Sequence, residues 1–272
     1  MSFALRQNSS IILVPPLGGG MEINMTAIQP RFCFLSGNAL KIIAALCMLC
    51  DHVGMFFFPK ITVMRIIGRL AFPIFAFMIA EGAAHTKSKI RYLSTVALIA
   101  VALQTIYFLY EKRLTMCVFV TFTFALILIF LFDLFKNALF DMESKSYQVI
   151  LYGTAFIIAL TAIAIFNNFF FVEYGFWGCA TPLLASLFRA PKQNSPRWLT
   201  LCDRLPVHVI MCGVGLLAVA LTRGQIQFWA LFAIPLLLLY SGKRGRLKLK
   251  YFFYVFYPAH LGLLELINML IK

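Results

Sequence analysis

Long apolar segments follow one another from residue 39 to the end of the chain, and they constrain the fold more than any other feature. Segments of about 20 apolar residues are long enough to cross a bilayer as α-helices. The composition agrees, because 62% of the 272 residues are hydrophobic and only 12% are charged. A soluble protein of this size carries far more charge on its surface.

The sequence therefore predicts an all-α, polytopic transmembrane helix bundle with about nine spans. The seventh and eighth are short for a full crossing. The predicted spans are 39–58, 64–84, 92–110, 115–135, 147–166, 170–188, 206–222, 226–240 and 251–271.

Basic residues are distributed unevenly between the connecting segments. With the amino terminus in the cytoplasm, seventeen lysines and arginines fall on the cytoplasmic side and five on the other, while Arg65 and Arg69 enter the second span. Because cytoplasmic loops of membrane proteins carry this excess, a cytoplasmic N-terminus is predicted. The bias also explains most of the net charge of +14, so membrane lipids are expected around the protein and no nucleic-acid partner is expected. The cytoplasmic set is Arg6, Arg31, Lys41, Lys87, Lys89, Arg91, Lys136, Lys145, Arg189, Lys192, Arg197, Arg204, Lys243, Arg244, Arg246, Lys248 and Lys250.

Residues 1–38 differ from the rest of the chain. Two prolines and three glycines between residues 15 and 20 interrupt any helix. We expect a poorly ordered tail over 1–38, in which Met21 or Met25 is an alternative start, and one transmembrane domain over 39–272.

Two ionisable residues of the first span lie on one helical stripe. Lys41 and His52 are eleven residues apart, which corresponds to about three turns and about 16 Å along a helix axis. His260 lies about 14 Å from the cytoplasmic end of the last span by the same measure. Both histidines are thus predicted near the middle of the bilayer, where an ionisable side chain is costly and indicates function. The coincidence predicts a reaction chamber at the midplane, with structural hydrogen bonding as the alternative for either histidine.

Further charged side chains accompany the histidines. Arg65 and Arg69 are one turn apart and share a face of the second span, where Pro73 is expected to kink or break the helix. Asp51 lies about 100° around the first helix from His52, so it can support His52 or pair with an arginine. In the structural alternative, the arginines meet lipid headgroups and the acids cap helix ends or face solvent. The remaining candidates are Glu81, His85, Glu173, Tyr174, Tyr257 and Glu265.

These residue types suit acid–base chemistry. A neutral imidazole in an apolar pocket can remove the proton from a hydroxyl or amine, and a basic stripe from Lys41 suits an anionic donor that enters from the cytoplasm. Coenzyme A has this form, with phosphates at one end and a thioester at the end of a long arm. Because the sequence has no Ser–His–Asp set, HExxH helix or phosphate loop, we expect direct acyl transfer. Cys47, Cys50 and His52 resemble metal ligands, but a matching second pair is missing and no metal is expected.

Five segments resemble the TraX family of membrane proteins, which is named for an enzyme that acetylates the amino terminus of conjugative pilin. They are LKIIAALCMLCDHVG (40–54), RIIGRLAFPIFAFMIAEGAAHT (65–86), EYGFWG (173–178), which replaces the usual Asp-Tyr-Gly, ALFAIPLLLLYSGKRG (230–245) and YFFYVFYPAHL (251–261). The family is in turn similar to the acyltransferase family 3 membrane enzymes, which carry an Arg, ten residues and then a catalytic His. Lys41 and His52 match this motif with Lys for Arg. The resemblance implies His52 as the base and Lys41 as a residue that binds an acyl-CoA donor.

We therefore expect a multi-pass acyltransferase of the bacterial inner membrane that uses acetyl-CoA, or another acyl-CoA, and acts on a peptide amine, a sugar or a lipid-linked acceptor. Two other classes remain open: a transporter or flippase of an acylated or lipid-linked intermediate, and a non-enzymatic scaffold of a secretion or conjugation apparatus. The expected catalytic residues are His52, Asp51 and His260, the expected donor-binding residues are Lys41, Arg69 and Arg65, and the expected acceptor-binding residues are Glu81, Glu173, Tyr174 and Tyr257.

Overall fold

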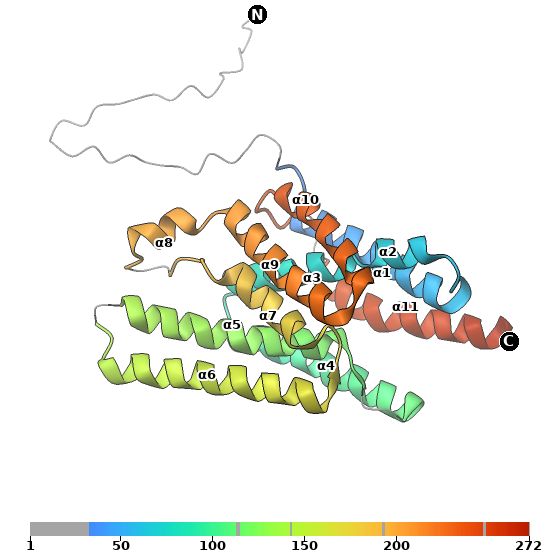
Figure 1. The fold of residues 1–272 in the computed structure, drawn as a ribbon, viewed down its shortest axis with the longest axis horizontal. Helices are drawn as coiled ribbons and strands as arrows, with labels where there is room; N and C mark the ends of the chain where they lie inside the picture. Colours follow the sequence, from blue (N-terminus) through green and yellow to red (C-terminus); the bar gives the residue numbers. More distant parts are fainter. Residues whose placement is uncertain (1–32, 113–114, 142, 192–193, 247–248, 272) are drawn as a thin grey trace, which may run out of the picture. The chain divides into compact units, whose positions relative to one another are not determined.

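The described residues fold mainly into helices (Figure 1), which confirms the predicted all-α class. The predicted tail lies, up to residue 32, outside the described residues, and the first helix begins at Gly37, two residues before the predicted start. The computed structural model describes residues 33–112, 115–141, 143–191, 194–246 and 249–271.

Seven helices of the described chain are long and apolar enough to cross a bilayer: α1, α2 and α3 taken together, α4, α5, α6, α9 and α11. This supports a polytopic membrane protein. In chain order the elements are α1 (Gly37–Phe57), α2 (Thr62–Gly68), α3 (Ala71–His85), α4 (Lys89–Glu111), β1 (Thr115–Met116), α5 (Val118–Phe140), α6 (Ser146–Phe169), β2 (Phe171–Val172), α7 (Gly175–Ser186), α8 (Arg197–Cys202), α9 (Leu205–Arg223), the 3₁₀ helix η1 (Gln225–Phe232), α10 (Ala233–Leu238) and α11 (Lys250–Ile271).

Three predicted spans differ from expectation. The sixth, 170–188, starts with β2, which pairs in parallel with β1, so its helix α7 has only 12 residues. Its first residues are aromatic and β-branched, a composition that suits a strand and that an apolar run does not distinguish from helix. The eighth, 226–240, is η1 followed by the six-residue α10. The seventh, predicted to be short, is the 19-residue α9 and is long enough to cross.

The second predicted span is broken near Pro73, as expected. α2 ends at Gly68 and α3 begins at Ala71, because in a continuous helix the Pro73 ring would clash with the carbonyl of Arg69, four residues before it. The break places Arg69 at the joint between two short helices.

Segments that the charge pattern assigns to the cytoplasm gather at one end of the bundle. The backbone N–H of Gly37 donates to the carbonyl of Lys243 at 2.8 Å, and the Lys136 ammonium donates to the carbonyl of Arg189 at 3.1 Å. Figure 1 shows the α5–α6 connection and α8 at the same end. Four cations of the predicted set, Arg6, Arg31, Lys192 and Lys248, lie outside the described residues.

The buried centre of the bundle consists mainly of α3, α5, α7 and α9. α7 and α9 approach closely, since a Cβ added to Gly215 would lie 2.7 Å from the Thr181 hydroxyl. By contrast, α6 packs on α5 with Ile163 as its one buried residue, and α11 packs chiefly against α1. Apolar side chains cover these exposed faces, which is the surface that lipid requires.

Reporter fusions test the predicted orientation. We expect alkaline phosphatase to be active and green fluorescent protein to be dark when either is fused after residue 272, because an odd number of crossings places the C-terminus outside when the N-terminus is cytoplasmic. The reverse is expected after Lys145, between α5 and α6. The opposite pattern at both positions would contradict the orientation.

Candidate active site

The two predicted histidines are in direct contact. Nδ1 of His52 on α1 lies 2.7 Å from Nε2 of His260 on α11, and their rings stack with centroids 4.9 Å apart. Nδ1 of His260 in turn lies 2.7 Å from the backbone carbonyl of Phe256. The prediction that both histidines lie at one level is therefore confirmed.

This hydrogen-bonded series assigns the protons of the neutral histidine pair. A carbonyl oxygen can only accept, so Nδ1 of His260 carries the proton and donates it to Phe256. Nε2 of His260 is then an acceptor, and Nδ1 of His52 donates to it. Nε2 of His52 is left unprotonated, which is the state that a general base requires.

The carboxylate of Asp51 joins α1 to the α2–α3 joint. Arg69 donates from Nη2 to both carboxylate oxygens, at 2.8 and 2.9 Å, and Arg65 donates from Nη1 at 3.2 Å. This confirms the expectation that Asp51 can pair with an arginine. The contact requires Gly68, because a Cβ added there would lie 2.2 Å from the Cβ of Asp51.

Glu173 and Tyr174 lie where β2 meets α7. The backbone N–H of Val118, at the start of α5, hydrogen-bonds the Glu173 carboxylate, a favourable position for an anion. Tyr174 has a φ of 63°, in the left-handed region, and its ring stacks on Phe72 with centroids 3.8 Å apart. A non-glycine residue with this backbone is strained unless its surroundings hold it.

Two adjoining cavities connect these residues to the end of the bundle predicted to be cytoplasmic. The first, here the histidine cavity, has a volume of about 130 Å³ and is lined by His52, Asp51, Glu173, Tyr174 and Tyr257 among others. The second, here the basic cavity, has a volume of about 450 Å³ and its lining includes Lys87, Arg91 and Arg244. The cavities share the lining residues Lys41, Met78, Tyr92, Phe253 and Tyr254.

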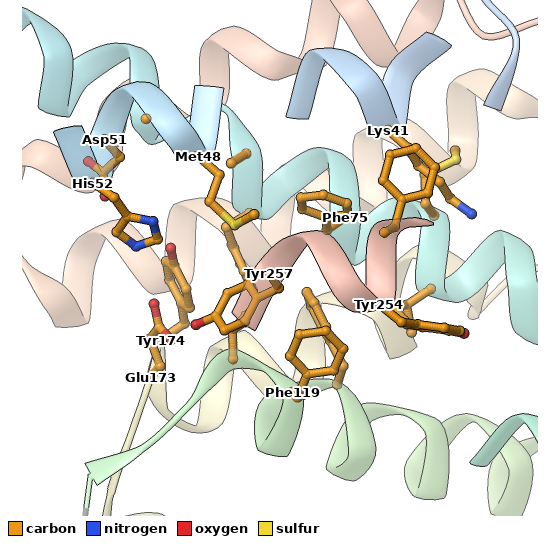
Figure 2. A pocket seen from close by; sticks show the side chains of 18 of the residues that line it. Lys41, Met48, Asp51, His52, Phe75, Phe119, Glu173, Tyr174, Tyr254 and Tyr257 are labelled. Carbon is orange, nitrogen blue, oxygen red and sulfur yellow. The ribbon is translucent and has the colours of Figure 1, made fainter. Parts of the chain in front are cut away.

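Figure 2 shows how side chains converge on the histidine cavity. The His52 ring points into it from α1, and Tyr174 and Glu173 lie opposite, while Tyr257 reaches across from α11. Lys41 lies at the far end from His52, with its ammonium 6.0 Å from the centre of the Phe253 ring. One stripe of α1 thus presents a cation at one end of the cavity and an imidazole at the other.

Three predicted site residues lie elsewhere than expected. Glu81 lines the basic cavity, apart from the other predicted acceptor-binding residues. It is buried, pairs with the Arg189 guanidinium and accepts from the Tyr240 hydroxyl at 3.4 Å. Arg65 and Arg69, predicted to bind the donor, contact Asp51 behind the cavity wall.

Sequence reasoning missed Tyr92, Tyr254 and Phe253, which line both cavities. A signal was present for α11, because Phe253, Tyr257 and His260 follow the spacing of one helical face. Tyr92 carries no such signal, since it depends on how α4 packs against the rest. Among the described residues, no group of three or more His, Cys, Asp or Glu side chains could hold a metal ion.

Comparison with known proteins finds a matching protein family. The family described as TraX protein matches residues 36–268. A probable fimbrial assembly protein, FimC of serogroup H1, from Dichelobacter nodosus is 26% identical over 253 residues, which cover 84% of this chain and 94% of that protein. An uncharacterized protein of Rickettsia prowazekii (strain Madrid E) is 48% identical over 40 residues, 15% of this chain and 16% of that protein. No solved structure matches the chain.

Replacing Gly68 by Ala tests the contact between α1 and the α2–α3 joint. The added methyl overlaps Asp51, so we expect Gly68→Ala to lower the free energy of unfolding by about 1–3 kcal/mol, measured by thermal unfolding in detergent. The matched control is Gly262→Ala in α11, where an added Cβ meets nothing within 4 Å. Equal melting temperatures for both variants and the wild type would show that the close approach is unimportant.

Proposed function

This chain belongs to the TraX protein family, and we propose that it is a membrane-bound acyltransferase that transfers an acetyl group from cytoplasmic acetyl-CoA to an amine or hydroxyl acceptor. The observation that carries the proposal is the hydrogen-bonded series from Phe256 through His260 to His52. It leaves the His52 nitrogen that is not bonded to His260 unprotonated, on a ring that faces a cavity. Acyl transfer to an amine or hydroxyl needs such a base.

The arrangement of charge supports an acyl-CoA donor. Lys41, Lys87, Arg91 and Arg244 surround the basic cavity, and clustered cations of this kind bind phosphates. The adjoining histidine cavity is smaller and mostly apolar, which suits the end of the CoA arm and a small acyl group. We assign the nucleotide end of the donor to the basic cavity and the thioester to the histidine cavity, with Lys41 contacting the donor at the boundary.

In the proposed reaction, the acceptor gives its N–H or O–H proton to Nε2 of His52 while its nitrogen or oxygen attacks the thioester carbonyl. The new C–N or C–O bond forms and the C–S bond breaks. The CoA thiolate leaves and takes the proton from the His52 imidazolium. His260 accepts the hydrogen bond from Nδ1 of His52 throughout and stabilises the imidazolium. The phenols of Tyr174 and Tyr257 face the cavity and are placed to donate to the developing oxyanion.

Asp51, Arg65 and Arg69 are positioning residues in this proposal. The bonds from Arg69 and Arg65 to Asp51 hold the segment of α1 that carries the neighbouring His52. A base displaced by about 1 Å can lose 10²-fold in rate. We therefore assign these three residues to the orientation of His52 rather than to contact with the donor.

The acceptor is proposed to bind beside Glu173, Tyr174 and Tyr257. A peptide amine, a sugar and a lipid-linked compound all offer the required N–H or O–H group. The Dichelobacter nodosus relative carries the name of a probable fimbrial assembly protein, which favours a peptide among the three. Because acyl-CoA is a cytoplasmic donor, we place the protein in the bacterial inner membrane.

Acetyl-CoA binding and turnover by purified protein in detergent test the proposal. We expect His52→Ala to bind acetyl-CoA normally and to release CoA thiol about 10²–10⁴-fold more slowly than the wild type, because the general base is lost. The control is His208→Ala: this histidine is buried too, but it pairs with Asp203 outside both cavities, so its loss should affect stability and leave turnover per folded protein unchanged. Folded wild type that binds no acetyl-CoA would reject the acyltransferase in favour of a transporter, flippase or scaffold.

The role of His260 is tested by two substitutions. His260→Ala removes the acceptor for Nδ1 of His52, and we expect kcat to fall about 100-fold, within the range of general-base effects, with little change in KM for acetyl-CoA. His260→Gln supplies an amide oxygen as a new acceptor and should restore part of kcat. If both variants lose the same small amount of activity, His260 serves packing alone.

A further inference from the structure

We propose that Phe72 and Phe122 form a wall that limits the donor to short acyl groups, and that Phe122 is the residue that determines this limit. The inference rests on the proposed acyltransferase function and deepens it, because it concerns which acyl group the histidine cavity accepts. Both rings line this cavity, and both are almost fully buried.

Stacked aromatic rings build the wall. Phe72 on α3 lies between two rings: Tyr174, with centroids 3.8 Å apart and planes 12° apart, and Phe122 on α5, with centroids 6.1 Å apart and planes 5° apart. Phe119, one turn before Phe122, meets it edge to face, and also meets Tyr257 at 5.1 Å. The wall on α3 and α5 therefore packs against Tyr174, the residue before α7, and is connected through Phe119 to Tyr257 on α11.

The wall is joined to the inner end of the cavity through Tyr174, on which Phe72 stacks. Lys41 marks the donor entrance, and the Tyr174 phenol lies opposite His52 at the other end (Figure 2). A thioester carbonyl beside His52 therefore directs its acyl chain toward the rings that pack on Tyr174. Each additional methylene has to fit between His52 and these rings.

The wall is also rigid, so it cannot move aside for a longer chain. Tyr174 has a left-handed backbone, with Gly175 after it in the same region, and it stacks on one face of Phe72. Phe122 holds the opposite side from the interior of α5. Close-packed rings of this kind transmit strain rather than absorb it. Because these rings cannot move aside, they set the upper size of the acyl group that the histidine cavity accepts.

Phe122 is the better of the two residues to change. Phe72 supports the Tyr174 ring directly, so its removal would disturb a residue placed in the proposed machinery. Removal of Phe122 enlarges the cavity itself, because the Phe122 ring lines it, and leaves the Phe72–Tyr174 stack in place. The matched control is Phe124→Ala on the same helix, because Phe124 packs against Phe166 of α6 at 5.3 Å and does not line the cavity.

The experiment compares kcat/KM for acetyl-, propionyl- and butyryl-CoA, measured as release of CoA thiol by purified protein in detergent. In the wild type we expect butyryl-CoA to be about 10-fold or more poorer than acetyl-CoA, since a single methylene in a tight pocket is worth about 10-fold or more. Phe122→Ala should raise the butyryl-to-acetyl ratio by about 10-fold. Phe124→Ala should leave the ratio at its wild-type value.

The outcomes separate this inference from the proposed function. A wild type that releases no thiol from any of the three donors overturns the acyltransferase itself. A wild type that uses acetyl-CoA, together with a folded Phe122→Ala that keeps the wild-type ratio, overturns the role of Phe122. If Phe122→Ala does not fold, Phe122→Leu removes less of the ring and should shift the ratio in the same direction, and an unchanged ratio in that variant is equally decisive.

Discussion

The ion pair between Asp51 and Arg69, extended by Arg65, is the interaction on which the rest of the site depends. Charged side chains inside a membrane protein are costly unless they are paired and hydrogen-bonded. Arg69 satisfies this demand by donating to both oxygens of Asp51, and the absence of a side chain at Gly68 lets the two helices meet closely enough. The pair determines how α1 lies against the broken second span, and with it the direction in which His52 points.

Much of this arrangement could be predicted from the sequence, because it depends on helical periodicity and on local rules. The common depth of His52 and His260 followed from counting residues along two helices. The helix break near Arg69 followed from the chemistry of Pro73. Each of these features lies within a few turns of the residue that causes it.

Other features depend on distant partners and could not be predicted in this way. The apolar residues of β2 belong to a strand because they pair with β1, more than fifty residues earlier, which hydropathy alone does not reveal. Glu81 is buried because it pairs with Arg189, which follows the end of α7. The sequence of its own span offered, as an alternative, an acid that caps the helix end or faces solvent. Tyr92 belongs to both cavities only because of how α4 packs.

The position of α11 has a consequence for when the site comes into existence. This helix packs chiefly against α1, yet it supplies His260, which is 208 residues from its partner His52. Every other described helix is synthesised before the second histidine leaves the ribosome. The cations of the basic cavity and the stacked rings of Phe72, Phe122 and Tyr174 thus belong to segments made earlier, and the unprotonated imidazole acquires its orientation only when the last helix docks. Docking of the last helix therefore completes the bundle and the site together.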